Sequence, residues 1–253
     1  MVMSSGYVGM SPLELAAMGR QQDVLQSELR KCPNKLKDSM VVASRFSCEI
    51  TIETIKRLIE PAWLNSELIT FFNEYWAERI GGSSGQKMPE IDPKIYFSNT
   101  YFYTKMVDDT YCFQKIARWS KKLDIFALDR MIIPINEVEI HWFLAVINFK
   151  KQRIEIWDSM GSRHLDVIDA LFRYLQDEHR AKKGFDLDIS SWSCEPVDSP
   201  QQTNCHDCGV FCCMFAAYRA IDRPFDFSQD DMSRIRGWMM SVICETGGFI
   251  CPV

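Results

Sequence analysis

The chain has 253 residues, enough for one large domain or two small ones. Hydrophobic residues make up 47% and charged residues 25%, which is typical of a globular protein with a proper core. The net charge of −5 comes without a basic stripe, which argues against nucleic acid as the main partner. No apolar run could span a bilayer, and residues 1–9 lack the features of a secretory signal. We therefore expect neither a nucleic-acid nor a membrane partner, and a monomer.

The ten cysteines do not have the spacing of a disulfide framework. Cys205, Cys208, Cys212 and Cys213 crowd into nine residues, and a chain of this size can build a core without covalent staples. The sequence therefore predicts mostly free thiols and a reducing, intracellular compartment, in the nucleus or the cytoplasm.

The N-terminal part of the chain predicts an appendage. Ser11 and Glu14 suit a capping box around Pro12, so a helix is expected from there to about residue 30. A polar stretch at 31–37 follows. We expect residues 1–40 to form a helical appendage and residues 41–253 to form the main domain.

The order of the predicted elements indicates an α+β fold. Helical spacing of apolar residues marks 52–59 and 66–80, with Asn65 or Ser66 as the cap of the second helix. The glycine-rich segment 81–85 reads as a flexible loop. Strands are expected at 131–136, 140–147, 153–157 and 185–189, and helices at 165–175, 209–221 and 232–243. The strands cluster between helices without a repeating βαβ pattern.

His141 is the candidate general base. His164 and His179 lie on or beside the polar side of a predicted helix, where exposure to solvent is expected. His141 instead begins a strongly apolar strand, where an ionisable group is costly without a partner. If residues 148–151 form a hairpin loop, His141 lies opposite Asp158, which would hold the imidazole and raise its basicity. A purely structural His–Asp pair remains the alternative.

Cys208 is the candidate nucleophile. A turn-rich loop, Asp198 to Asp207, leads to Cys208, and Gly209 then opens an apolar helix. The unpaired N–H groups and the dipole at a helix N-terminus favour a thiolate. Zinc is the competing interpretation, because Cys205 and Cys208 have ligand spacing, with His206 and Cys212 nearby. A structural zinc site normally needs a second such pair, which the chain lacks, so we expect no metal.

Five segments in order resemble the ubiquitin-like-protein proteases, which process and remove SUMO and related modifiers. They are Trp63-Leu64-Asn65, the stretch Phe97 to Tyr103, His141-Trp142, Trp157-Asp158-Ser159, and Pro200 to Asn204 leading to Asp207-Cys208-Gly209. The resemblance covers residues 45–247 and implies a fold akin to the papain and adenovirus proteases, with a central mixed sheet flanked by helices.

The resemblance implies roles for matching positions. Cys208, His141 and Asp158 would form a triad, and Gln202 would donate its amide to the oxyanion. Trp63 and Trp142 would form the lid and wall of a narrow tunnel over the Gly-Gly tail of the substrate. Without the resemblance, a hydrophobic staple at a helix start is the alternative interpretation of Trp63.

Two departures from the family pattern concern the substrate side. The family often has an acidic residue after Trp-Leu-Asn, which contacts a basic residue of the modifier, and Ser66 stands there. Asn65 and Ser66 are therefore candidate substrate-binding residues. Small polar residues often precede the Asp-Cys pair, whereas this chain has Cys205-His206.

The sequence thus predicts a cofactor-free cysteine isopeptidase and C-terminal hydrolase for a ubiquitin-like modifier, SUMO first. The alternatives are a deneddylase or deubiquitinase with the same mechanism, an acyltransferase that uses the same triad, and a catalytically silent modifier-binding module. The intact set of Cys, His, Asp and Gln argues against the silent module.

Overall fold

The computed structural model describes residues 10–17, 38–59, 61–85, 88–90, 92–137, 140–194 and 197–247. Its centre is a five-stranded mixed sheet of β3 (Ser83–Ser84), β4 (Ile95–Phe97), β5 (Arg130–Glu137), β6 (His141–Asn148) and β7 (Arg153–Trp157), in that spatial order. β3, β4 and β5 run parallel, and the β5-β6-β7 part is antiparallel. A separate hairpin joins β1 (Val41–Arg45) to β2 (Cys48–Thr51).

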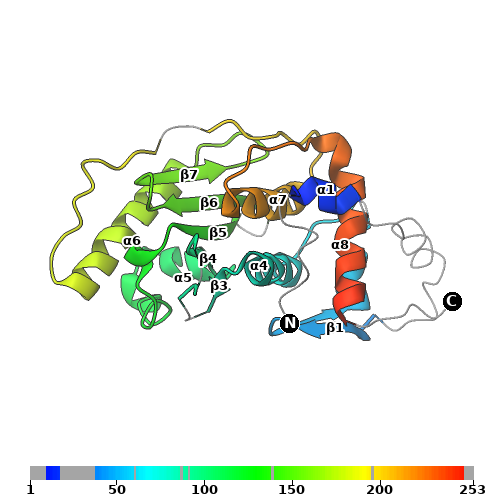
Figure 1. Ribbon diagram of the computed structural model, residues 1–253, viewed down its shortest axis with the longest axis horizontal. Coiled ribbons are helices and arrows are strands. Elements are labelled where there is room, and N and C mark those ends of the chain that lie inside the picture. Colours follow the sequence, from blue (N-terminus) through cyan, green and yellow to red (C-terminus); the bar gives the residue numbers. More distant parts are fainter. Residues whose placement is uncertain are drawn as a thin grey trace.

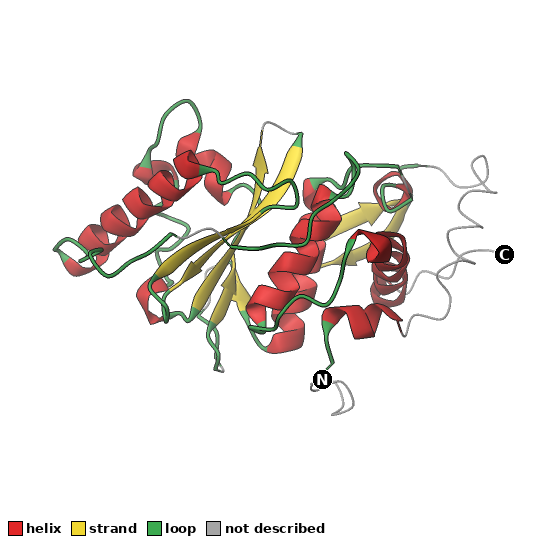
Figure 2. Ribbon diagram, turned by 90° about the horizontal axis from the view of Figure 1, so that it is seen from above, coloured by secondary structure: helices red, strands yellow, loops and turns green. Residues whose placement is uncertain are grey.

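Helices cover both faces of the sheet, so β6 is buried along its whole length. Figure 2 shows the sheet between one long helix on one side and several helices on the other. Phe143, Ala145 and Ile147 belong to the core shared with α6 (Leu165–Lys183). The alternate residues of β6 belong to the core shared with α4 (Ser66–Ile80) and α7 (Cys208–Ala220). Because β6 is covered on both faces, nearly all of its side chains must be apolar, as the sequence shows.

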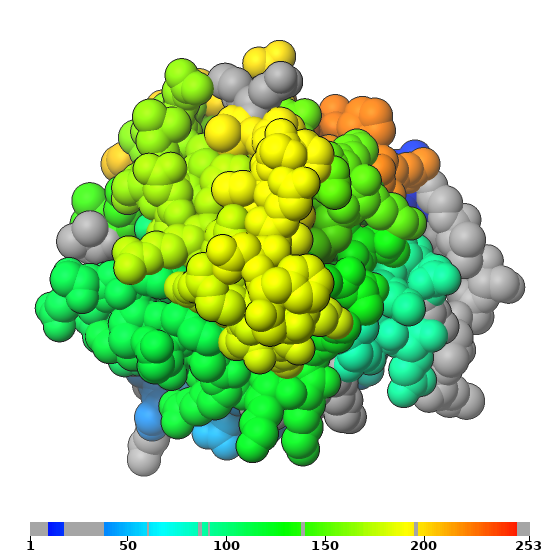
Figure 3. Space-filling view, turned by 90° about the vertical axis from the view of Figure 1, so that its left-hand side faces the viewer, coloured from blue at the N-terminus to red at the C-terminus, as the bar shows by residue number. Residues whose placement is uncertain are grey.

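The remaining helices complete the two layers. α8 (Met232–Gly247) stands beside α7 and next to the β1-β2 hairpin (Figure 1). α3 (Ile52–Lys56) follows that hairpin, and α5 (Phe102–Val107) follows β4. Three short 3₁₀ turns lie at Phe113–Lys115, Ile125–Ala127 and Gln229–Asp231. In Figure 3, the segment that leaves α6 (yellow) runs along the outside of one end of the molecule.

The α+β class is confirmed, and several elements lie where the sequence predicts them. Asn65 is the N-cap of α4, with its side chain accepting a hydrogen bond from the N–H of Leu68 at 3.3 Å. The strand predicted at 153–157 and the helices predicted near residues 165, 209 and 232 are present. The prediction of mostly free thiols holds for the eight described cysteines, whereas Cys32 and Cys251 lie outside the described residues.

Two predicted segments have a different secondary structure from the one expected. Residues 185–189 do not form a strand, because their alternation reflects exposed apolar side chains, such as Phe185 at 65% exposure, rather than a buried face. Part of the predicted flexible loop, Ser83–Ser84, pairs with β4 as the short strand β3. Gly81, at φ 69°, ends α4 in the left-handed conformation that glycine adopts without steric cost.

Part of the N-terminal segment packs on the domain. α1 (Pro12–Ala17) lies beside α7 and α8, and Leu15 and Ala16 belong to the same core. The continuation of that helix to residue 30 lies outside the described residues. The division of the chain at residue 40 stays a prediction, with α1 already attached to the main domain. None of the described helices is long and apolar enough to cross a membrane.

The register of the β6-β7 hairpin differs from the predicted one by two residues. Asn148 pairs with Arg153, so the loop is 149–152 instead of 148–151. Continuing that register places Asp158 opposite Phe143, with His141 two residues further along the same face. Because side chains alternate with a period of two, a shift of two keeps both on one face, where diagonal neighbours still meet. The predicted contact therefore survives the error in register.

Candidate active site

The hairpin brings the predicted base, His141, into direct contact with Asp158, the carboxylate expected to orient it. His141 Nε2 lies 2.8 Å from Asp158 Oδ1, and both side chains are buried. Asp158 comes directly after β7, where the strand has ended and the backbone can turn. The backbone N–H of Met160 donates to the same oxygen at 2.7 Å. The backbone just after β7 therefore helps to hold the carboxylate of Asp158 against the imidazole of His141.

The pKa values of this pair move in opposite directions. Burial alone would lower the pKa of His141, but hydrogen bonds to Asp158 and Cys208, and their charges, raise it to about 9. Burial alone would raise the pKa of Asp158, but the hydrogen bonds that it accepts hold this pKa well below its usual range. The arrangement therefore favours an imidazolium held by a carboxylate, and such a cation can stabilise a neighbouring thiolate.

Cys208 is the first residue of α7 and lies close enough to His141 to help raise the pKa of the imidazole. It is buried, with 2% of its surface exposed. A Cβ added at Gly209 would lie 2.8 Å from the Cβ of Leu64, so only glycine allows the helix start to approach the Trp63 loop this closely. Cys212 lies inside the helix, where burial raises the pKa of its thiol. Cys208 alone combines a helix N-terminus with a histidine partner among the described cysteines.

A buried ion pair holds the residues just before the nucleophile. Arg236 of α8 is fully buried, and its Nε donates to Asp207 Oδ1 at 2.8 Å. The rest of its guanidinium donates to three backbone carbonyls at 2.9 Å each, those of Arg57, Ala62 and His206. One side chain therefore joins α8, the loop before the nucleophile and the segment that leads to Trp63.

Asp207 accepts further hydrogen bonds at Oδ2, from the amides of Asn204 and Gln229 at 2.7 and 2.8 Å. Burial alone would raise the pKa of Asp207, but these bonds and Arg236 lower it. Its side chain makes no capping bond to α7, because both oxygens accept hydrogen bonds from other side chains. Asp207 therefore acts as an anchor for the loop.

Gln202 is held by both ends of its amide. Its Oε1 accepts a hydrogen bond from Ser159 Oγ, and its Nε2 donates to the carbonyl of Asn204, each at 2.6 Å. An amide has two N–H groups, so one remains for a substrate oxyanion. The role of oxyanion donor stays a prediction, supported by this fixed orientation.

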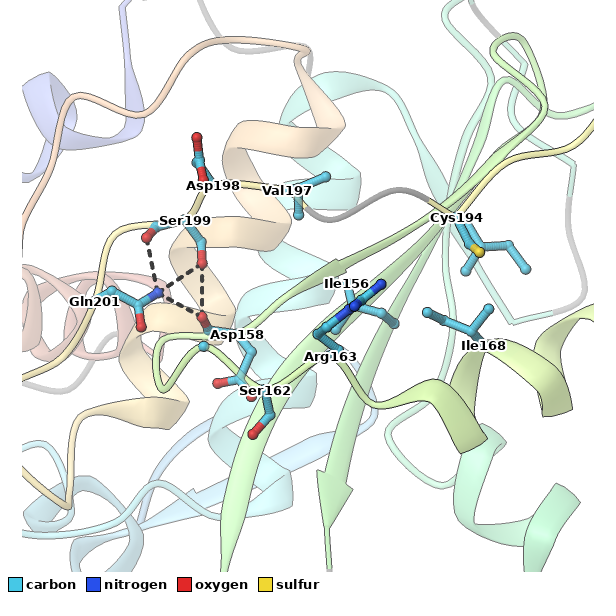
Figure 4. Close-up of a pocket in the computed structure, with 12 residues that line it drawn as sticks. Ile156, Asp158, Ser162, Arg163, Ile168, Cys194, Val197, Asp198, Ser199 and Gln201 are labelled. Carbon is cyan, nitrogen blue, oxygen red and sulfur yellow. Dashed lines mark hydrogen bonds between the residues drawn. The ribbon is translucent and has the colours of Figure 1, made fainter.

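The loop that carries Gln202 is tied to the hairpin end. Ser199 Oγ and Gln201 Nε2 both donate to the backbone carbonyl of Asp158, at 2.8 and 3.0 Å. Figure 4 shows these bonds at one end of a pocket of about 290 Å³ behind the carboxylate. The N–H of Gln202 donates to the carbonyl of Ser159 at 2.8 Å. The same contacts therefore position both Asp158 and the predicted oxyanion donor, Gln202.

A cleft of about 280 Å³ opens beside the thiol. The four predicted substrate-binding residues line it together with Cys208: Trp63, Asn65, Ser66 and Trp142. The indole of Trp63, 41% exposed, donates to the carbonyl of Cys205 at 2.7 Å, and the buried indole of Trp142 donates to that of Leu64 at 3.0 Å. Both rings are thus fixed by hydrogen bonds next to the nucleophile.

One group of side chains in the described ranges could hold a metal ion: His141, Asp158 and His164. The nitrogen–oxygen distances in this group are 2.7 and 2.8 Å. Neighbouring ligands of a tetrahedral zinc ion, with bonds of 2.0–2.1 Å, are separated by about 3.3 Å. The group is therefore arranged as hydrogen-bonded partners. The cysteines around residue 208 do not form such a group in the described part of the chain.

The expectation that His164 and His179 face solvent is wrong. His164 turns inward to Asp158, and His179, 9% exposed, bonds through Nδ1 to the carbonyl of Phe185 at 2.8 Å. Arg236 was not predicted as a site residue. Arg234 and Arg236 both stand in the apolar helix predicted at 232–243, and an arginine on the buried face of such a helix requires a partner. His164 had no comparable signal, because its contact depends on the turn after β7.

The comparisons with known proteins agree with this geometry. The family described as "Ulp1 protease family, C-terminal catalytic domain" matches residues 62–245. Sentrin-specific protease 2 of Homo sapiens is 33% identical over 79% of this chain and 33% of its own length. Ubiquitin-like-specific protease 1 of Saccharomyces cerevisiae is 30% identical over 82% of this chain and 31% of its own. The chain thus spans about a third of the length of these relatives.

Solved structures share the fold. The C-terminal Ulp1 protease domain, in complex with the yeast SUMO ortholog Smt3, aligns with a TM-score of 0.72 at 28% identity, over 90% of this chain and 95% of that one. The Chaetomium thermophilum Ulp1-like SUMO protease catalytic domain aligns with a TM-score of 0.68 at 20% identity, over 91% and 90% of the two chains. The second likeness concerns the fold alone.

Replacing Arg236 should lower the free energy of unfolding far more than replacing a nearby exposed arginine. Arg236→Met leaves Asp207 as an uncompensated buried charge, which costs about 3–5 kcal/mol. Arg234→Met is the matched control, because Arg234 forms a 2.6 Å surface pair with Asp231 and is 41% exposed. Such a pair contributes about 0–1 kcal/mol. Denaturant unfolding measures both changes, and equal effects would contradict the role assigned to Arg236.

The pH dependence of stability should report the raised pKa of His141. The folded pKa of about 9 lies above the ordinary value of 6.5. Protonation of His141 therefore stabilises the folded state fully below about pH 6.5, and this contribution is lost as the pH rises through about 9. The free energy of unfolding of the wild type should fall more steeply between pH 6 and 10 than that of His141→Gln. Parallel curves would show that the pKa of His141 is not raised.

Proposed function

Because the chain belongs to the Ulp1 protease family, we propose that it is a cysteine protease that cleaves after the Gly-Gly end of a SUMO-type modifier. It would act both as an isopeptidase on conjugates and as a C-terminal hydrolase on precursors. The observation that carries the proposal is the contact of Cys208, His141 and Asp158 at the edge of a cleft lined by Trp63 and Trp142. We also propose that it works as an intracellular monomer, in the nucleus or the cytoplasm.

The proposed reaction is an acyl transfer in two stages. His141 holds the proton that Cys208 gives up, and the sulfur attacks the carbonyl carbon of the second glycine of Gly-Gly. The negative charge that develops on the carbonyl oxygen is stabilised by the free N–H of Gln202 and the backbone N–H of Cys208. His141 then gives this proton to the leaving amine as the amide bond breaks. In the second stage His141 takes a proton from water, the water oxygen attacks the thioester carbonyl, and the C–S bond breaks to release the carboxylate and restore Cys208. These steps need no cofactor.

The two indoles account for the preference for glycine. Trp63 and Trp142 are each fixed by an indole N–H bond, so the cleft between them cannot widen by simple rotation of a ring. A Cβ on the substrate would clash there, and glycine alone would pass. The likeness to a yeast protease domain solved with a SUMO ortholog supports a modifier of that type. Ser66 lines the same cleft without a charge.

Covalent capture tests the proposed nucleophile and the modifier together. The protein is incubated separately with SUMO, ubiquitin and the cullin modifier, each carrying a C-terminal electrophile. We expect a covalent adduct with SUMO, mapped to Cys208 by mass spectrometry, and none with Cys208→Ala, which should still bind the modifier. An adduct on Cys205 would overturn the assignment of the nucleophile. An adduct with ubiquitin alone would overturn the choice of SUMO.

Substitution of Gln202 separates an oxyanion donor from a structural loop residue. The donor acts on charge that appears only during the attack, so its loss lowers turnover more than binding. Gln202→Ala should cost about 2–4 kcal/mol in the chemical step. Gln202→Glu should be at least as harmful, because a carboxylate repels the developing charge. Steady-state kinetics on a Gly-Gly-terminated reporter measure both, and unchanged turnover in both variants would remove Gln202 from the mechanism.

A further inference from the structure

A second histidine binds the carboxylate that orients the proposed base. His164 Nε2 lies 2.7 Å from Asp158 Oδ2, whereas His141 Nε2 and the N–H of Met160 both use Oδ1. The two imidazoles therefore hold the two oxygens of one carboxylate from different sides. The hydrogen bond from His164 also contributes to the lowered pKa of Asp158.

The position of His164 is set by its backbone and by a ring contact. Its φ of 44° lies in the left-handed region, which is costly for a residue with a Cβ. It stands at the N-cap of α6 but makes no capping bond, because the ring turns towards Asp158. The ring stacks on Phe143 with centroids 3.7 Å apart and an interplanar angle of 7°. Its side chain is 6% exposed.

The surroundings of this ring explain its orientation. Nδ1 of His164 faces Glu137 Oε1 at 3.9 Å, while Nε2 faces Asp158. The other titratable groups near the carboxylate are His141, in direct contact with it, and Cys208, in contact with His141. Asp158 thus lies at hydrogen-bond distance from one nitrogen, whereas Glu137 lies beyond that distance from the other. The ring cannot turn over without losing its short bond.

We propose that His164 is a positioning residue for the reaction proposed above, and this inference rests on that proposed function. Rotation of a carboxylate about its last side-chain bond is soft, with a broad two-fold profile. The bond to Oδ2 removes this freedom, so that Oδ1 stays aligned with His141. A buried carboxylate also requires donors on both oxygens, and His164 supplies the one on Oδ2.

The matched variants are His164→Phe and His164→Gln. Phenylalanine keeps a ring on Phe143 but has no donor, whereas the amide nitrogen of glutamine can reach the place of Nε2. We expect His164→Phe to lower kcat on a Gly-Gly-terminated SUMO reporter about 10-fold, as expected for the loss of one charge-assisted hydrogen bond, with KM unchanged. His164→Gln should restore most of the turnover. Equal losses in both variants, or a change confined to KM, would overturn the proposal.

Two measurements test His164 without any modifier, so a failure of the proposed function remains distinguishable. The first is the rate at which iodoacetamide alkylates Cys208 at neutral pH, which should fall in His164→Phe and recover in His164→Gln. The second is the downfield NMR signal of the His141 Nε2 proton, which should move or broaden in the phenylalanine variant. A wild-type alkylation rate with an unmoved signal would show that His164 only fills space beside Phe143.

Discussion

The contact between Arg236 and Asp207 is the constraint on which the active site depends. It lies behind the site, fully buried, and joins three segments that are far apart in the sequence. The start of α7 can carry a nucleophile only if the preceding loop keeps one conformation, and Asp207 fixes that loop. The same guanidinium fixes the carbonyl of Ala62, beside Trp63. The ion pair thus determines how the nucleophile and the cleft lie relative to each other.

A second set of contacts does the same for the base. The carbonyls of Asp158 and Ser159 accept hydrogen bonds from the loop that carries Gln202. These hydrogen bonds therefore join the end of the β6-β7 hairpin, which carries Asp158, to the loop that leads to Cys208. The sheet supplies His141 from β6, and α7 supplies the thiol from the opposite layer. These contacts use the backbone carbonyl of Asp158 and the backbone N–H of Gln202 and leave the carboxylate of Asp158 to His141 and His164.

The sequence could predict the parts of this site that depend on local pattern. The apolar run of β6, the turn-rich loop before Cys208 and the polar start of α4 each have a signature in neighbouring residues. The contact of His141 with Asp158 followed from the period of a strand, which tolerates a two-residue error in register. His164 and Arg236 could not be placed in this way, because their partners are brought to them by the turn after β7 and by the packing of α8. The β1-β2 hairpin was missed because its strands are short and only partly buried.

The close approach of Gly209 to Leu64 has a consequence for anyone who wishes to redesign the specificity of this protein. Leu64, which lines the cleft, packs so closely against the first turn of α7 that no side chain fits at residue 209 between them. A larger side chain in place of Leu64, introduced to change which substrate tail is recognised, would also displace the start of α7 and with it the sulfur of Cys208. Selection for altered specificity should therefore recover paired changes on both segments, and single substitutions at this contact should trade recognition against reactivity.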